Sequence, residues 1–75
     1  MTIGDLKRLF GTAIKGKRSE LGISQEELAA RAKLHRNYIS SIERGERDVG
    51  LSALQRLART LGVSLAQFFE PFGRS

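Results

Sequence analysis

The sequence contains no cysteine and a single histidine, His35. Without cysteine the chain forms no disulfide and offers no thiolate to a metal ion. One imidazole with no second histidine supplies too few ligands for a zinc site. We therefore expect no metal and no other cofactor. The lack of disulfides is also compatible with a reducing cytoplasm.

Long apolar runs are missing as well. No stretch approaches the ~20 apolar residues that a membrane-spanning helix needs. The first residues, Met1 to Ile3, do not lead into the apolar centre of a signal peptide. These absences predict a cytoplasmic protein with no membrane partner.

The residue groupings of common enzymes are absent too. We find no paired carboxylates and no nucleophile beside a base. Gly11 and Gly16, followed by Lys17, have some of the spacing of a phosphate-binding loop. That loop follows a strand, whereas these glycines lie inside a helical pattern. The sequence therefore predicts that the protein is not an enzyme.

Acidic residues are the minority, with eight Asp plus Glu against thirteen Lys plus Arg and a net charge of +5. Such a balance favours a polyanion as partner, although a basic surface without a partner is the alternative. The 75 residues contain no repeat or linker and predict one domain, residues 1–75. A domain of this size buries only about 60% of its unfolded surface, so it often gains stability by pairing.

Two short helical patterns dominate the middle of the chain, over residues 25–44. Ser24 followed by Glu27 predicts a capping box that starts a helix over about 25–32. A second helix is expected from residue 35 or 36 to about 43. The two helices have apolar residues on one face each, which predicts that they pack together across a tight turn; these are Leu28, Ala29 and Ala32, then Ile39 and Ile42.

The other face of the second helix is polar and basic. It presents hydroxyl, amide and guanidinium groups, with Tyr38 beside them: Arg36, Asn37, Ser40, Ser41 and Arg44. Side chains of these types read base edges and phosphates in DNA complexes. The face is therefore a candidate DNA-binding surface.

Helical spacing continues on both sides of this motif. After a loose lead-in at 1–4, we expect a helix that Gly22 ends, with Gly16 at a close helix crossing; its apolar residues are Leu6, Leu9, Phe10, Ala13, Ile14 and Leu21. A later helix ends at Gly62 and has apolar residues at Leu51, Leu54, Leu57, Ala58 and Leu61. Ser64 and Gln67 form a second capping box, which opens a short fifth helix ended by Pro71. The predicted fold is all-α, a compact five-helix bundle.

The positions of the motif residues resemble those of a known family. Gln25, Ala29, Leu34, Ile39 and Ile42 match the helix-turn-helix of phage-repressor and Cro-like (Xre) regulators, and the flanks Gly11-x-x-Ile14-Lys15-x-x-Arg18 and Leu61-Gly62-Val63-Ser64 extend the match. Within that family, the run from Arg36 to Ser40, Ile42-Glu43-Arg44 and then Arg47 look most like the controller proteins of restriction-modification systems.

The resemblance implies a function. Members of the Xre family have the fold of the phage-repressor DNA-binding domain, so we expect the helix-turn-helix at helices two and three. It implies a sequence-specific transcriptional regulator, an activator or repressor, that binds an inverted-repeat operator in double-stranded DNA as a homodimer without a small-molecule ligand. RNA polymerase is a further candidate partner. The alternative is an antitoxin, or another small Xre-type repressor, that also binds a protein.

The resemblance also implies residue roles. Arg36, Asn37 and Ser41 are expected to reach base edges. Ser40 and Tyr38 are expected at the groove wall, although Tyr38 packed over helix two is an equal alternative. The expected phosphate contacts are Gln25, Arg44 and Arg47, of which Arg47 has a base as its alternative target. Apart from the resemblance, the single imidazole of His35 is expected at the helix N-terminus near a phosphate, with capping of the helix or exposure to solvent as the alternatives.

Other residues are implied to be structural. Arg18 and Glu43 match a family ion pair that ties the first helix to the third. Lys33 stands where the family usually has glycine, at a turn position that tends to positive φ. Leu65, Phe69 and Phe72 are the expected dimer interface, because the C-terminal end has more apolar residues than a small bundle covers. Phe68 is expected in the core of its own subunit.

Overall fold

The computed structural model describes residues 1–68, which contain four α-helices and no strand. The helices are α1 (Ile3–Leu21), α2 (Gln25–Ala32), α3 (Arg36–Glu43) and α4 (Leu51–Leu61). Residues 65–68 form a further helical turn at the start of the expected fifth helix. The all-α prediction is confirmed. No helix in the described range has the length and apolar character needed to cross a membrane.

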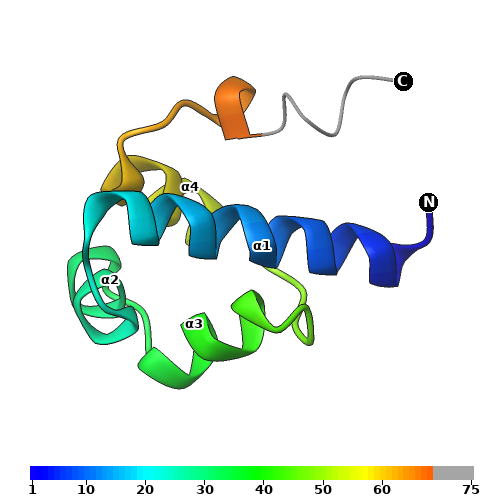
Figure 1. Cartoon of the computed structure of the whole chain (residues 1–75), viewed down its shortest axis with the longest axis horizontal. Helices are drawn as coiled ribbons and strands as arrows, with labels where there is room; N and C mark the ends of the chain where they lie inside the picture. The colour runs from blue at the N-terminus through cyan, green and yellow to red at the C-terminus, as the bar shows by residue number, and fades with distance from the viewer. Residues whose placement is uncertain (69–75) are drawn as a thin grey trace.

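The long helix α1 runs across the molecule and packs against α3 and α4 (Figure 1). The short α2 packs against both α3 and α4. Five side chains that are almost completely buried fill the space between the helices: Ile14, Leu28, Ile39, Ile42 and Leu57. Each of the four helices contributes to this core, so the orientation of α3 is fixed by packing on its inner face.

The start of α1 differs from the expectation of a loose lead-in. Thr2 is the N-cap: its hydroxyl accepts a hydrogen bond from the Asp5 backbone N–H, and the Thr2 N–H donates to the Asp5 carboxylate, both at 3.0 Å. The hydrogen bond from the Thr2 backbone N–H to the Asp5 carboxylate is the largest cause that holds the pKa of Asp5 below its ordinary value. The helix therefore begins at Ile3, because this Thr-x-x-Asp pair satisfies free N–H groups of the first turn.

The predicted close crossing is at a different glycine. A Cβ atom on Gly11 would lie 2.2 Å from the backbone carbonyl oxygen of Ile42, so α1 meets the end of α3 backbone to backbone. A Cβ on Gly16 would have nothing within 4 Å, and the assignment of the crossing to Gly16 is wrong. The helix ends were predicted correctly: Gly22 and Gly62 adopt φ of 69° and 72° in the left-handed conformation that ends α1 and α4.

Several apolar residues expected in the core lie at the surface. Leu6, Leu9 and Leu21 are 42%, 43% and 50% exposed. Leu9 lies beside buried Phe10, between Arg8 and Gly11, which both contact the rest of the fold, so it is exposed because it points to another side of α1. Leu51 is 84% exposed, because the buried residues Ala53, Leu57 and Leu61 define an inner face from which it points away.

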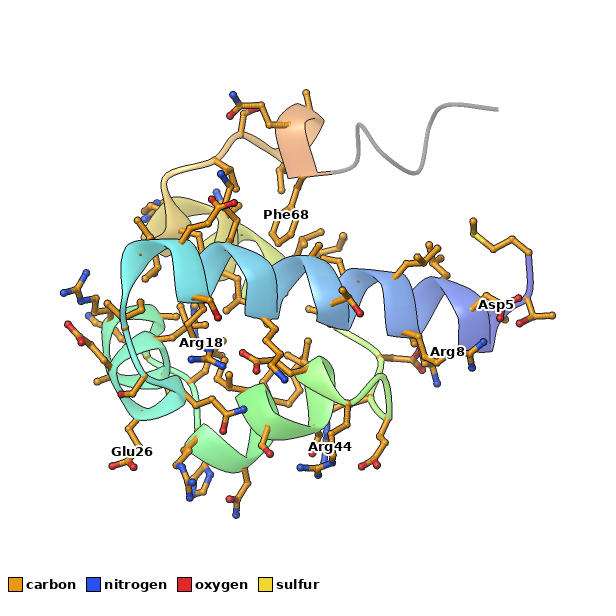
Figure 2. All side chains as sticks on the ribbon, viewed as in Figure 1. Asp5, Arg8, Arg18, Glu26, Arg44 and Phe68 are labelled. Carbon is orange, nitrogen blue, oxygen red and sulfur yellow. The ribbon has the colours of Figure 1, made fainter. Side chains whose placement is uncertain are left out.

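The turn at 65–68 packs onto α1. The Phe68 ring is buried, and its centroid lies 5.0 Å from that of Phe10 (Figure 2). The predicted capping box is present, since the Ser64 N–H donates to the Gln67 side chain and the Gln67 N–H donates to the Ser64 hydroxyl. The prediction that Phe68 joins its own core is confirmed. Leu65 is 46% exposed, and Phe69 and Phe72 lie outside the described residues.

Candidate nucleic-acid interface

The start of α2 is capped by Ser24, whose hydroxyl accepts a hydrogen bond from the Glu27 backbone N–H at 3.0 Å. The expected capping box is only half formed. The Glu27 carboxylate bonds to Arg31, one turn further along the helix, instead of returning to Ser24. A guanidinium at i+4 is a charged partner, and it competes well with a neutral N–H for the same carboxylate.

The turn between α2 and α3 depends on Lys33. It adopts φ 57° and ψ 46°, and among residues 1–68 it is the one non-glycine residue with positive φ. The predicted conformation of Lys33 is thus confirmed. Its N–H and that of Leu34 bond back to the carbonyl groups of Ala30 and Ala29, which ends α2. The Arg56 guanidinium of α4 also lies 3.4 Å from the Lys33 carbonyl oxygen.

His35 is the N-cap of α3. Its Nδ1 atom accepts a hydrogen bond from the Asn37 backbone N–H at 3.0 Å. Because Nδ1 is an acceptor here, the neutral ring has its proton on Nε2. The exposed ring therefore caps the helix with Nδ1, and its Nε2–H remains a free donor. This donor lies at the N-terminus of α3, where the first backbone N–H groups of the helix are also free.

The polar face of α3 is open. Arg36 and Asn37 are exposed, Ser40 and Ser41 are partly buried, and Figure 2 shows polar side chains directed from α3 away from α1. The Ser41 hydroxyl donates to the Asn37 carbonyl oxygen at 2.8 Å, so its free capacity is as an acceptor. Arg36 lies 3.8 Å from the Glu26 carboxylate in an exposed ion pair, which contributes little to stability.

Arg44 lies just after α3 and is already partnered. It donates to the Ser40 hydroxyl and lies 3.1 Å from the Glu46 carboxylate. Both acidic partners on this side, Glu26 and Glu46, are exposed, so ion pairs with them exchange readily for a phosphate.

A buried ion pair fixes α3 against α1. Arg18 donates to both carboxylate oxygens of Glu43, at 2.8 and 3.0 Å, and its third nitrogen donates to the Ile23 carbonyl oxygen at 3.0 Å. The side chains are 14% and 3% exposed. Gln25, at the first position of α2, donates its side-chain amide to the same carboxylate at 3.0 Å. Glu43 thus ties three helices together.

The charge state of Glu43 follows from this arrangement. Burial raises the pKa of its carboxyl, but the hydrogen bonds from Arg18 and Gln25 and the charge of Arg18 outweigh burial and hold the pKa below its ordinary value. The hydrogen bond to Glu43 likewise raises the pKa of Arg18. Gln25, which was expected at a phosphate, donates its side-chain amide to Glu43 in this structure.

Tyr38 of α3 contacts Arg47 in the connector that follows α3. The guanidinium carbon of Arg47 lies 5.3 Å from the centre of the Tyr38 ring. The Tyr38 hydroxyl lies 3.4 Å from both the Asp48 carbonyl oxygen and the Gly50 N–H nitrogen. The hydroxyl end of the ring is thus directed to the connector 44–50 and not to α2.

Contacts between α1 and this connector were not predicted from the sequence. Lys7 forms an ion pair with Asp48 at 3.3 Å. A Cβ atom on Gly45 would lie 2.9 Å from the Arg8 Cα atom, so the connector passes directly against α1. Gly45 adopts a positive φ of 73°, a conformation that glycine adopts easily, so the glycine itself is the local indication of a turn here.

Comparison with known proteins agrees with this geometry. The family model described as helix-turn-helix matches residues 14–68. The chain is 41% identical over 68 residues to the control protein C.MunI of Mycoplasma sp, covering 89% of this chain and 92% of that protein. It is 43% identical over 60 residues to the control protein C.BamHI of Bacillus amyloliquefaciens, covering 79% and 74%.

Solved structures give the same result. The restriction-modification controller protein C.AhdI from Aeromonas hydrophila superposes with a TM-score of 0.81 at 35% identity, covering 84% of this chain and 96% of that one. The controller protein C.Esp1396I, as a tetramer in complex with its natural 35 base-pair operator, superposes with a TM-score of 0.80 at 39% identity, covering 88% and 87%. The chain belongs to the helix-turn-helix family, within which it is similar to the controller proteins of restriction-modification systems.

Proposed function

We propose that the protein is a sequence-specific DNA-binding regulator of transcription, a controller protein of a restriction-modification system. The observation that carries the proposal is the polar, basic and open face of α3, which the buried Arg18–Glu43–Gln25 contacts hold in one orientation. A fixed helix with such a face suits entry into the major groove. The relatives named as control proteins support the same conclusion.

The proposed contacts follow from the exposed groups. Arg36, Asn37 and Ser41 reach base edges, with Ser40 at the groove wall and Tyr38 beside it. Arg36 binds guanine N7 and O6 with two hydrogen bonds, which is the strongest common base contact. Phosphates are bound by cations and N–H groups around α3, namely Gln25, His35, Arg44 and Arg47. These contacts anchor the protein without selecting sequence.

The active form is a homodimer on an inverted-repeat operator. Its interface includes Leu65, Phe69 and Phe72, and the exposed Leu65 is the described part of that surface. Two recognition helices in such a dimer lie about 34–36 Å apart, one turn of DNA. Regulation then depends on operator position and dimer concentration, with RNA polymerase as a further partner and no catalysis. Because the proposed target is DNA, a cytoplasmic location follows from the same proposal.

Selection of duplexes from a random pool tests the proposal. The wild-type protein should enrich an inverted repeat, and footprinting on that duplex should show two protected half-sites one helical turn apart. Sedimentation should show two chains per repeat. Failure to enrich any sequence, or binding of one chain to an isolated half-site with full affinity, would overturn the proposal.

A further inference from the structure

Arg47 differs from the other candidate DNA-binding cations in its partner. Arg36 and Arg44 face the carboxylates of Glu26 and Glu46, at 3.8 and 3.1 Å. Arg47 has no carboxylate within 4.0 Å in residues 1–68 and instead lies over the ring of Tyr38. We propose that Tyr38 is a positioning residue, which holds Arg47 in its DNA-binding orientation and affects DNA binding mainly through it.

The stacked arrangement is suited to this role. The contact of an exposed guanidinium with an aromatic ring leaves N–H donors of the guanidinium free for other partners. Arg47 therefore remains able to form two parallel hydrogen bonds with a phosphate or a guanine while stacked. Stacking also restricts a long side chain before DNA binds, which lowers the entropy cost of ordering it in the complex.

The ring is itself fixed. Tyr38 is partly buried and packs against the hydrophobic core from the first turn of α3. Its hydroxyl lies 3.4 Å from backbone atoms of Asp48 and Gly50, which follow Arg47 in the connector. At that distance each hydrogen bond is weak, so the ring face and not the hydroxyl makes the larger contribution.

The connector that contains Arg47 is also held from α1. Lys7 pairs with Asp48 at 3.3 Å, and the Gly45 backbone lies against Arg8, which Figure 2 shows on α1 beside this segment. The Gly45 contact places the backbone of the connector against α1 just before residue 47, whereas the Lys7–Asp48 pair, in which Asp48 is 84% exposed, adds little. What remains free is the Arg47 side chain, and the Tyr38 ring is the group that orders it.

The stacking itself can be measured without DNA. In the wild type, the ring current of Tyr38 should shift the side-chain methylene protons of Arg47 upfield in the proton NMR spectrum. Tyr38→Phe should keep that shift, and Tyr38→Leu should abolish it. Tyr38→Leu keeps an apolar side chain against the core, and the amide spectrum shows whether the fold is intact. An Arg47 spectrum that is identical in wild type and Tyr38→Leu would overturn the contact.

Coupling to DNA binding is tested by a double-mutant cycle on the duplex that the wild type enriches from a random pool. Tyr38→Leu should weaken binding by about two- to fivefold, the effect expected for an exposed cation–π contact. Tyr38→Phe should recover most of that loss. In an Arg47→Ala background, Tyr38→Leu should have almost no further effect. The matched control is an Arg44→Ala background, where the full effect of Tyr38→Leu should persist.

The inference rests on the proposed function, and the two fail differently. If the wild type enriches no duplex, the proposed function fails. If it binds but the losses from Tyr38→Leu and Arg47→Ala add independently, Tyr38 acts by its own contact or by folding, and the positioning role is overturned. A loss in Tyr38→Phe equal to that in Tyr38→Leu would identify the hydroxyl as the active group and would also overturn it.

Discussion

Arg18 and Glu43 stand 25 positions apart, yet the guanidinium of one meets the carboxylate of the other through two parallel hydrogen bonds of 2.8 and 3.0 Å. One residue lies near the end of α1 and the other is the last residue of α3. Because the pair is almost fully buried and joins two helices, it acts together with the packing of Ile39 and Ile42 to orient α3.

Removing one partner should leave the other charge buried without compensation. We expect Arg18→Ala to lower the free energy of unfolding by ~3–5 kcal/mol, as for other broken buried pairs. Urea unfolding followed by circular dichroism measures the change. Arg31→Ala is the matched control, because its pair with Glu27 is exposed and should contribute under about 1 kcal/mol. Equal effects of the two substitutions would contradict the structural role.

The same pair predicts how stability depends on pH. The pKa of Glu43 is lowered in the folded protein from an ordinary value near 4.5. A depressed pKa means that the contribution is complete above pH 4.5 and is lost as the pH falls through the folded value. The stability difference between wild type and Glu43→Gln should therefore shrink below pH 4.5. A difference that grew in acid would show the opposite sign of the shift.

Arg36→Ala should change specificity. Loss of a bidentate guanine contact is expected to weaken binding of the selected operator by ~1–3 kcal/mol and to relax the preference at one base pair per half-site. Arg44→Ala should weaken all sequences alike and lower the salt dependence by about one phosphate. Mobility-shift titrations against operator and random duplexes separate the two. The assignment is wrong if Arg36→Ala weakens both duplexes equally.

Lys33→Gly should stabilise the protein slightly. The left-handed conformation at φ 57° costs a non-glycine residue roughly 1–2 kcal/mol, and glycine removes that cost. The extra freedom of glycine in the unfolded chain offsets part of the gain. A small rise in the urea midpoint with unchanged slope is the expected result. A lower midpoint would mean that the lysine side chain stabilises the turn more than its backbone conformation costs.

Phe69→Glu should separate the dimer. A charge placed in an apolar two-fold interface is repeated on both subunits, so the monomer should keep much of its helical circular dichroism and bind operator weakly. Sedimentation equilibrium at tens of micromolar measures the association. Ala30→Glu adds the same charge at an exposed position of α2 and should leave the dimer intact. A monomeric wild type, or a Phe69→Glu variant that still pairs, would contradict this interface.

The sequence by itself determined where α1 and α4 end and, through the family resemblance, the helix-turn-helix. Gly22, Gly62 and the Ser64–Gln67 capping box were predicted correctly, because each depends on hydrogen bonds between residues at most five positions apart, and the conformation of Lys33 was predicted from the family resemblance. Two wrong predictions from the sequence also concern local hydrogen bonds. The Thr2–Asp5 box was missed, and the carboxylate of Glu27 pairs with Arg31 instead of closing a box with Ser24.

Tertiary structure decided which faces meet. Periodicity shows that α1 has an apolar stripe, but only the packing of its neighbours determines that Ile14 is buried and Leu9 is 43% exposed. Likewise, only the crossing of α1 over the end of α3 distinguishes Gly11 from Gly16. The contacts of Arg47 with Tyr38 and of Lys7 with Asp48 depend on where the connector passes. Such long-range geometry arises from packing the whole core at once, which no short stretch of sequence specifies.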